Sequence, residues 1–355
     1  MHRAGLETML MNYYRNIDRE KIQFDFLTHR PQRSDYDDEI ESLGGKIYYA
    51  PRLYPQNYSK YFKWMKQFFS EHPEYKIIHS HIDAMSYLPL KAAKKAGIPV
   101  RIAHSHSTSI DRDFKYLLKQ YYRYRLQSVL THEFSCGKAA GDFLFQNDKF
   151  TLIPNAVDAK KFYYDESVRN AVRVELGISK QTFVMGHVGR ISYPKNHCFL
   201  IDIFKEFYAI NKNSILLIVG TGDMEEEIKK YASESGVSEN IKFLGNRNDT
   251  ERLYQVFDVF ILPSLFEGVP LVGIEAQFAD LPCFFSDKVP AEVVFSDKTN
   301  FISLNQSAEK WAREIANVDI TKRDSGRSII INADYNIQTA HNILEEKYYE
   351  LFELI

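Results

Sequence analysis

Cysteine is scarce in this 355-residue chain, and the three that occur, Cys136, Cys198 and Cys283, lie far apart. An odd number without a CxxC spacing argues against a disulfide framework or a cysteine-rich zinc site and is typical of a reducing compartment. No apolar run approaches the ~20 residues that a membrane span requires. The polar start Met1-His2-Arg3 lacks the apolar region of a signal peptide. We therefore expect a cytoplasmic protein.

Net charge is also nearly absent, because 45 Lys+Arg face 47 Asp+Glu. Disordered chains combine high net charge with few aromatic residues, whereas this chain is 14% aromatic and 45% hydrophobic. Nucleic acid is not an expected partner, since domains that bind it are usually far more basic. A chain longer than ~250–300 residues divides into domains, and we expect two.

The small net charge conceals an uneven distribution. Residues 1–157 hold 23 Lys+Arg and 17 Asp+Glu, and residues 158–355 hold 22 and 30. The basic excess is concentrated in residues 91–125, where aromatic side chains alternate with the charges. This stretch contains Lys91, Lys94, Lys95, Arg101, Arg112, Lys115, Lys119, Arg123, Arg125, Phe114, Tyr116, Tyr121, Tyr122 and Tyr124, against Asp111 and Asp113. Such a face fits an anionic membrane surface or a phosphate-bearing partner. The alternative is a solvated amphipathic helix whose tyrosines pack on the core.

Short apolar runs alternate with helical patterns along the chain, which indicates an α/β fold with parallel sheets. The predicted strands are Ile22–Leu27, Ile47–Tyr49, Lys76–His79, Val100–His104, His132–Ser135, Thr151–Ile153, Phe183–Val188, Ser214–Val219, Ile241–Phe243, Val259–Leu262 and Cys283–Ser286. The predicted helices include Ser59–Ser70, Ala84–Ala96, His197–Ile210, Met224–Ser235, Thr250–Val256 and Leu271–Ala279.

The boundary between the domains is predicted at the polar turn that follows Ile153-Pro154. Residues 1–157 and 158–337 then form two Rossmann-like domains that face each other across a cleft, and a C-terminal helix over 338–355 can pack back onto the first. In open α/β sheets, ligands bind at the carboxyl ends of the strands.

The most informative motif is the string SLFEGVPLVGIEA, residues 264–276, which follows an apolar strand and opens a helix. Gly268 permits a tight turn before Val269, and Pro270 suits a helix start. The free N–H groups of Leu271 and Val272 would then favour an anion such as a diphosphate. Glu267 and Glu275 flank this helix start and could accept hydroxyls of a sugar and a ribose. Otherwise they are a capping and a solvent-facing carboxylate.

Three further strand ends carry turns of the same kind. The string HVGRISYPKN, residues 187–196, places Gly189, Arg190 and Lys195 after a strand, and two cations there can neutralise a diphosphate. The string VGTGD, residues 219–223, includes Gly220, and FLGNR, residues 243–247, includes Asn246. Alone, each of these pairs and turns fits an ordinary solvated loop.

In this order and spacing, the four strand ends resemble the donor domain of the retaining GT-B glycosyltransferases, specifically glycosyltransferase family 4. Gly5-Leu6-Glu7-Thr8 and residues 100–106 and 153–158 resemble segments of its acceptor domain. The resemblance, strongest to enzymes of capsular and exopolysaccharide assembly, implies that Arg190 and Lys195 contact the donor diphosphate. It also implies that Glu275 binds the ribose, that Glu267 holds the sugar and that residues near Asn246 line the base pocket. The implied donor-binding set is Gly5, Gly189, Arg190, Lys195, Gly220, Asn246, Glu267, Gly268, Val269, Leu271, Val272 and Glu275.

Two histidine pairs, His79-Ser80-His81 and His104-Ser105-His106, each follow an apolar strand. Residues two apart in an extended segment share a face, so each pair can present two imidazoles. Metal binding is one interpretation. No carboxylate or cysteine set accompanies the pairs, however, and the family needs no metal for its chemistry, so we predict none. The family pattern favours His106, and then His104, as the histidine that reaches the sugar. His79 and His81 are expected to be structural or acceptor-side residues.

The resemblance implies transfer of a hexose or N-acetylhexosamine from a UDP-linked donor to a glycan or polyprenyl-diphosphate-linked acceptor. The anomeric configuration would be retained, and the departing diphosphate could take the acceptor's proton. Two alternatives stay open. One is a GT-B epimerase or hydrolase of the sugar nucleotide. The other is a non-catalytic sugar-nucleotide-binding partner of another transferase.

One expected element has no counterpart in the sequence. The family pattern begins with an apolar strand and a glycine-rich loop, whereas this chain enters a helical pattern at Leu6, after only Met1-His2-Arg3-Ala4-Gly5. We therefore expect the first strand to be missing from this chain, with Arg3, Ala4 and Gly5 as the end of the loop. From this we expect a protein that starts upstream, or a form with reduced stability and activity.

Overall fold

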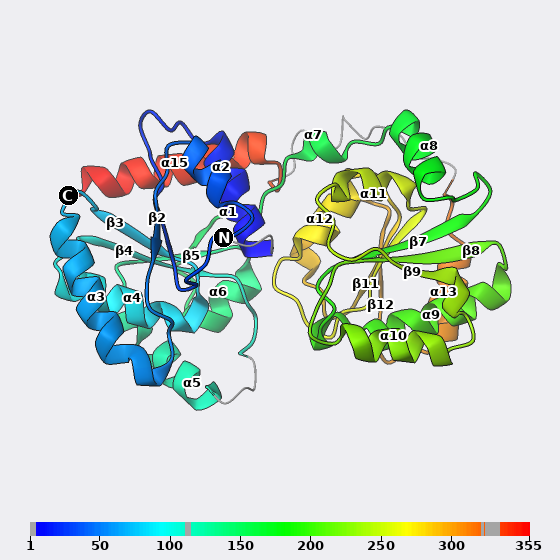
Figure 1. Cartoon of the computed structure of the whole chain (residues 1–355), viewed down its shortest axis with the longest axis horizontal. Helices are drawn as coiled ribbons and strands as arrows, with labels where there is room; N and C mark the ends of the chain where they lie inside the picture. The colour runs from blue at the N-terminus through cyan, green and yellow to red at the C-terminus, as the bar shows by residue number, and fades with distance from the viewer. Residues whose placement is uncertain (1–4, 111–114, 321–322, 324–333) are drawn as a thin grey trace. The chain divides into compact units, whose positions relative to one another are not determined.

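The computed structural model describes residues 5–110, 115–320, 323 and 334–355, which fall into two compact units (Figure 1). Unit 1 comprises Met1–Ala156 and Ile337–Ile355, and unit 2 comprises Val157–Asn336. The chain thus leaves unit 1 after its last strand and returns to it with its final helix.

Unit 1 contains two parallel sheets. Strands β3 (Ile77–Ser80), β4 (Val100–Ser105), β5 (His132–Ser135) and β6 (Thr151–Leu152) pair in that order, and β1 (Phe26–Thr28) pairs with β2 (Ile47–Tyr49). The helices are α1 (Gly5–Asn16), α2 (Asp37–Ser42), α3 (Tyr58–Glu71), α4 (Tyr87–Lys95), α5 (Tyr116–Arg125), α6 (Lys138–Phe145) and α15 (Ile337–Glu353). Within the described part of unit 1, no strand precedes α1 and none joins the two sheets. The expected loop residues Arg3 and Ala4 lie outside the described residues.

The prediction of a strand over Ile22–Leu27 was wrong at its start, because β1 begins only at Phe26. The residues just before Phe26 make side-chain contacts and pair with no strand among the described residues. Phe24 stacks on Tyr14 with ring centroids 5.6 Å apart. Asp25 accepts a hydrogen bond at 2.7 Å from the backbone N–H of Lys46. Strand pairing is thereby confined to the three residues opposite Ile47–Tyr49.

The buried face of helix α1 is hydrogen-bonded to residues 154–156, which follow β6. The Tyr13 hydroxyl donates to the carbonyl of Pro154 at 2.7 Å, and the Asn12 amide donates to the carbonyl of Ala156 at 2.9 Å. Helix α15 packs on α1, and its Tyr348 reaches the end of β3, where its hydroxyl lies 2.6 Å from His79 Nδ1. The two ends of the chain therefore complete the same unit.

Unit 2 is a six-stranded parallel sheet in the order β12-β11-β10-β7-β8-β9. Its strands are β7 (Phe183–Val188), β8 (Ser214–Val219), β9 (Ile241–Phe243), β10 (Val259–Leu262), β11 (Cys283–Ser286) and β12 (Thr299–Ile302). Its helices are α7 (Ala159–Phe162), α8 (Glu166–Glu175), α9 (His197–Ile210), α10 (Glu225–Glu234), α11 (Thr250–Val256), α12 (Leu271–Phe278) and α13 (Ala308–Ala316).

The central strands of unit 2 are apolar along their length because helices cover both faces of a parallel sheet. Leu216 and Ile218 of β8 are fully buried against Leu200 and Phe204 of α9. Strand β12 was not predicted from the sequence. It lies at the sheet edge, and Asn300 and Phe301 in its middle are exposed, so it lacks a buried strand's continuous apolar run.

The strand order reverses between β7 and β10. After β7 the chain adds β8 and β9 on one side, and it then returns to place β10 on the other side of β7. Such a switch point is where ligands of doubly wound sheets bind, because the connections after the two strands diverge there. The loops after β7 and β10 are part of the two sequence motifs, residues 187–196 and 264–276, that predict the donor site.

Candidate active site

The connections after β7 and β10 are held against each other by one backbone hydrogen bond and one from the side chain of Asn196. The N–H of Leu265 donates to the carbonyl of Pro194 at 2.8 Å, and the Asn196 amide donates to the carbonyl of Pro263 at 3.1 Å. Asn196 adopts a left-handed conformation with φ +56°, which turns the chain directly into α9. These contacts fix the side chains that the two loops carry.

Lys195 and Glu267, both predicted site residues, are brought together at this switch point. Lys195 Nζ lies 2.6 Å from Glu267 Oε1, and the Ser264 hydroxyl donates to the same oxygen at 2.6 Å. The side chains of Lys195 and Glu267 are only 16% and 12% exposed to solvent. A cation and a carboxylate thus stand side by side, both largely shielded from water.

Glu275 lies in α12 and is buried rather than solvent-facing. The Tyr254 hydroxyl of α11 lies within hydrogen-bonding distance of Glu275 Oε2, at 2.8 Å, and of the carbonyl of Val272, at 3.1 Å. Burial raises the pKa of Glu275 to about 7, although the hydrogen bond from Tyr254 opposes this shift. The carboxyl group is therefore poised between its acid and its carboxylate near neutral pH.

Helix α12 begins at Leu271 after the extended residue Pro270. The N–H groups of Gly273 and Ile274 donate to the carbonyl of Pro270 at 3.0 and 3.3 Å. Those of Leu271 and Val272 form no hydrogen bond among the described residues. Gly268 and Val269 complete the turn that precedes the helix. Two unpaired donors at a helix start are suited to an anion.

Gly189 and Gly220 let the loops after β7 and β8 approach closely. Gly220 has φ +130°, and a Cβ built on it would lie 2.1 Å from the carbonyl oxygen of Gly189. The N–H of Gly220 donates to the carbonyl of Gly245 at 2.8 Å. This bond links the loop after β9 to the loop after β8. Backbone contact of this kind requires glycine at position 220.

Arg190 and Asn246 lie at the solvent side of these loops. Arg190 forms an ion pair with Asp223 at 3.2 Å, with side chains 71% and 65% exposed. Asn246 is exposed. The neighbouring Arg247 is held by Asp249 at 2.8 Å. Of the two predicted diphosphate contacts, Lys195 is therefore fixed in place, and Arg190 can reorient at little cost because exposed ion pairs are weak.

The remaining predicted residues, His104, His106 and Gly5, belong to unit 1. Gly5 is exposed and begins α1. His104 lies in β4 and His79 in β3, and His106 and His81 directly follow these strands. The histidines are joined in two pairs from one strand to the other. His79 Nε2 lies 3.1 Å from His104 Nδ1, and His81 Nδ1 lies 3.0 Å from His106 Nε2.

Burial keeps all four imidazoles in the neutral form. It lowers the pKa of His79 and of His106 to about 3, and it lowers the pKa of His81 and of His104 well below the ordinary value. The carboxylate of Asp83 accepts the backbone N–H of His106 at 2.8 Å and the hydroxyl of Ser107 at 3.0 Å.

The described part of the basic region, 91–110 and 115–125, contains the last turn of α4, strand β4 and helix α5. On α5, Tyr122 is buried, whereas Leu117, Tyr121 and Tyr124 are 81%, 52% and 81% exposed. The alternative interpretation, a solvated amphipathic helix whose tyrosines pack on the core, therefore holds for Tyr122 and not for Tyr121 or Tyr124. Asp111, Arg112, Asp113 and Phe114 lie outside the described residues. Among the residues described, no helix is both long and apolar enough to cross a membrane.

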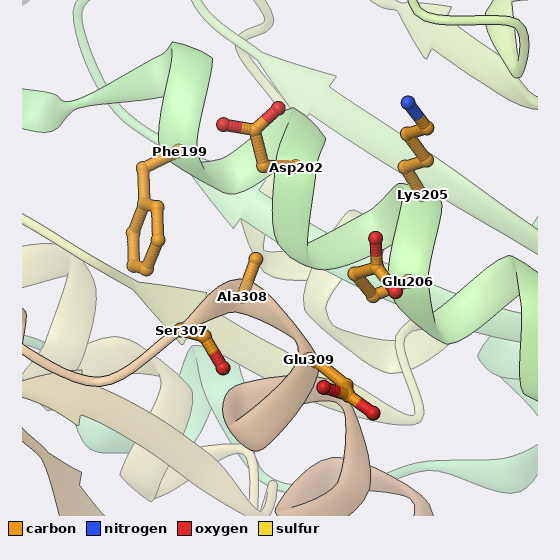
Figure 2. A pocket seen from close by; sticks show the side chains of 7 residues that line it. All are labelled: Phe199, Asp202, Lys205, Glu206, Ser307, Ala308 and Glu309. Carbon is orange, nitrogen blue, oxygen red and sulfur yellow. The ribbon is translucent and has the colours of Figure 1, made fainter.

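A separate hollow lies between α9 and the start of α13 in unit 2 (Figure 2). Phe199, Asp202, Ser307 and Glu309 are among the residues that line it. None of the predicted site residues contributes to this hollow, which is formed by helices rather than by the connections at the strand ends.

Comparison with known proteins identifies the family. Residues 3–161 match the family described as Glycosyltransferase Family 4, and residues 168–333 match Glycosyl transferases group 1. EpsF of Bacillus subtilis (strain 168), which is named as a glycosyltransferase, is 32% identical over 98% of this chain and 95% of its own. The chain belongs to the family 4 glycosyltransferases.

Other relatives of this glycosyltransferase carry more specific names. A protein of Escherichia coli named UDP-Gal:alpha-D-GlcNAc-diphosphoundecaprenol alpha-1,3-galactosyltransferase is 29% identical over 60% of this chain and 58% of its own. The crystal structure of Anabaena HepE in complex with UDP and glucose has a TM-score of 0.81 at 17% identity, covering 98% of this chain and 96% of that one. The predicted fold class, two Rossmann-like domains of GT-B type, is confirmed.

Several partners of the predicted residues, in unit 1 and in unit 2, were not assigned from the sequence. Tyr254 contacts Glu275 from another helix, and Asp223 pairs with Arg190 from the loop after β8. Tyr348 reaches His79 across 269 positions of the sequence. Asp223 lies inside a motif that the sequence displays, so its place near Arg190 could have been inferred. No local signal links Tyr254 or Tyr348 to its partner.

Proposed function

We propose that this glycosyltransferase moves a hexose or N-acetylhexosamine from a UDP-linked donor to a glycan or polyprenyl-diphosphate-linked acceptor in capsule or exopolysaccharide assembly. The observation that carries the proposal is the Lys195–Glu267 pair at the switch point between β7 and β10, next to the unpaired N–H groups that open α12. The cation and the helix start would bind the diphosphate of a donor, and the carboxylate would bind its sugar.

The difficult part of the reaction is the separation of an oxocarbenium-like sugar from a diphosphate that gains negative charge. Preorganised cations and N–H donors stabilise such charge as it develops, which is usually the largest catalytic effect. Lys195, Arg190 and the N–H groups of Leu271 and Val272 are assigned to the diphosphate. Because these groups supply the positive potential, the proposed chemistry needs no metal ion.

The other candidates position the donor. Glu275 would accept hydrogen bonds from the ribose, and Glu267 would accept them from hydroxyls of the sugar, oriented by Lys195 and Ser264. The exposed loop at Asn246 would line the pocket for the base. Gly189 and Gly220, which have no side chain, would let the diphosphate approach the backbone. His106, with His104 as the second candidate, would contact the sugar from unit 1.

We further propose retention of the anomeric configuration, with the departing diphosphate taking the proton of the acceptor hydroxyl. The sugar's bond to the diphosphate oxygen breaks as its bond to the acceptor oxygen forms on the same face. No protein base is then required, which agrees with a Glu267 that is engaged by a cation and a hydroxyl. Positioning of both substrates would supply much of the remaining rate.

The acceptor side is proposed to meet an anionic membrane surface through α5. The exposed side chains of α5 include Leu117, Tyr121 and Tyr124, and the same helix carries Lys119 and Arg125. Apolar and basic groups together favour binding to anionic lipid. The lipid-linked diphosphate named for the Escherichia coli relative would be presented at such a surface.

A two-stage experiment tests the proposed function. A panel of nucleotide sugars is first screened for protection against thermal unfolding, since a ligand that binds only the folded state raises apparent stability. The protective donor is then incubated with and without a polyprenyl-diphosphate-linked saccharide. We expect UDP release and a glycosylated lipid only when the acceptor is present. Free sugar or an isomer formed without acceptor would instead support the hydrolase or epimerase, and binding without any turnover would support the non-catalytic partner.

A further inference from the structure

The ends of β3 and β4 carry four imidazoles in one cluster. The two strands are neighbours in the sheet (Figure 1). They are parallel, with His79 opposite Ile102 and Ser80 opposite Ala103. Alternate residues of both strands therefore project from the same face. Ring centroids are 4.1 Å apart for His79 and His81, 4.2 Å for His104 and His106, and 5.0 Å for His81 and His104.

We propose that this histidine cluster binds a divalent transition-metal ion such as Zn²⁺, with His79, His81 and His104 as ligands. One ring nitrogen from each of the three lies within 4.8 Å of the others. Nitrogens that share a tetrahedral Zn²⁺ at about 2.0–2.1 Å lie ~3.3 Å apart. The 3.1 Å between His79 Nε2 and His104 Nδ1 already matches that spacing.

For His79 and His81, the second ring nitrogen has a neighbour suited to fix its orientation, whereas Nε2 of His104 is buried without a hydrogen-bond partner among the described residues. His79 Nδ1 lies 2.6 Å from the Tyr348 hydroxyl, and His81 Nδ1 lies 3.0 Å from His106 Nε2. Nε2 of His79 and of His81 would then face the ion. Metal-bound histidines usually make such a second hydrogen bond, which sets the tautomer and the ring orientation.

The chemistry of the donor set favours a borderline metal over Ca²⁺ or Mg²⁺. Neutral imidazole is a preferred ligand of Zn²⁺, Cu²⁺, Ni²⁺ and Co²⁺, whereas Ca²⁺ and Mg²⁺ require oxygen. Three histidines leave a fourth position for water or an anion. The ion would replace the direct contact between His79 and His104, and the carboxylate of Asp83 supplies negative charge at the same strand ends.

The proposed metal site uses none of the residues assigned to the donor diphosphate. The cations assigned to the diphosphate, Arg190 and Lys195, belong to unit 2, whereas the histidine cluster belongs entirely to unit 1. Binding can therefore be measured without any sugar nucleotide. Occupation would remove His104 from the contacts assigned to it in the proposed function, so a bound ion would slow transfer rather than support it.

The test uses the full chain without a polyhistidine tag, stripped of metal by a chelator and titrated with Co²⁺. We expect saturable visible bands of tetrahedral Co²⁺ at one ion per chain and displacement by Zn²⁺. His79→Gln and His81→Gln should each weaken binding by more than ~100-fold, and Tyr348→Phe by ~10-fold. His132→Ala, on neighbouring β5 but outside the cluster, is the matched control.

Thermal unfolding separates a lost site from a lost fold. Zn²⁺ should raise the midpoint of the parent and of His132→Ala and leave that of His81→Gln unchanged, while all three have similar midpoints in chelator. A parent chain without a saturable Co²⁺ spectrum overturns the proposal. So does a titration that is the same in His81→Gln, since the bound ion would then lie elsewhere. If His81→Gln unfolds early, the milder Tyr348→Phe variant decides.

Discussion

Lys195 and Glu267 are 72 positions apart in the sequence, and their charged atoms lie 2.6 Å from each other at the point where the sheet of unit 2 reverses its strand order. Each side chain therefore holds the other in position. Replacing either one leaves its partner shielded without the opposite charge, which costs more than the pair itself contributes. The two residues should for this reason behave as one functional unit.

Lys195→Ala and Glu267→Ala should both lower turnover, by ~10²–10³-fold, because charge and positioning are lost where the diphosphate departs. Glu267→Ala should leave binding of free UDP nearly unchanged, since the assigned contact is to the sugar. Turnover and UDP affinity are measured on each variant and on the double variant. A double variant whose loss equals the product of the single losses would contradict the idea of one unit.

Glu275→Ala should weaken UDP binding by ~10–100-fold, because ribose hydroxyls lose a hydrogen-bond acceptor worth about 1.5–3 kcal/mol. Calorimetric titration with UDP measures this directly. Glu239→Ala, an exposed glutamate of the same unit, is the control and should bind UDP like the parent. Undiminished affinity in Glu275→Ala would remove this residue from the donor site.

Glu275 also predicts how stability depends on pH. Burial raises its pKa from 4.5 to about 7, so the folded state holds a proton that the unfolded state has already released. This contribution to stability is complete below about pH 4.5 and is lost as the pH rises through about 7. Glu275→Gln, which stays neutral, should flatten that part of the pH profile of the unfolding midpoint, and Glu239→Gln should not. Parallel profiles for the parent and Glu275→Gln would contradict the raised pKa.

Gly220→Ala should be destabilising, because its φ is +130° and the new Cβ would meet the carbonyl oxygen of Gly189. Gly236 is the matched control. Its φ is +82°, but a Cβ there would have no heavy atom within 4 Å. Both variants bear the cost of a left-handed backbone, so a larger fall in the unfolding midpoint for Gly220→Ala isolates the clash. At ~2–4 °C per kcal/mol for units of this size, the difference is measurable. Equal midpoints would mean that the loops can separate freely.

Lys119→Glu with Arg125→Glu on α5 should reduce sedimentation with anionic vesicles, since each basic residue near such a surface contributes about 1 kcal/mol. Binding by the parent should also fall as salt rises, over a Debye length of ~8 Å at physiological ionic strength. Lys212→Glu with Lys230→Glu, neither of which is on α5, makes the same change in charge in unit 2. Equal binding of the parent to neutral and anionic vesicles would overturn the membrane proposal.

The sequence was informative wherever a site residue lies within a continuous strand–turn–helix string. The loops around Arg190, Lys195, Glu267 and Glu275 follow strands whose bounds were predicted to the residue, because fully buried parallel strands are uninterrupted apolar runs. Periodicity carries no information on which distant side chains meet. The partners of Glu275 and His79, namely Tyr254 and Tyr348, follow from packing across 21 and 269 positions. Strand β12 escaped prediction because its middle is exposed at the sheet edge.

The return of α15 to unit 1 has a consequence for synthesis on the ribosome. Unit 2 is encoded entirely between the two parts of unit 1, so it can complete its sheet while the end of the chain has not yet been made. Unit 1 must wait, because Tyr348, the tyrosine that reaches His79, follows the whole of unit 2 in the sequence. Its apolar surfaces around α1 stay uncovered until α15 has been made, and exposed surface of this kind promotes aggregation. Unit 1 thus begins before unit 2 and is completed after it.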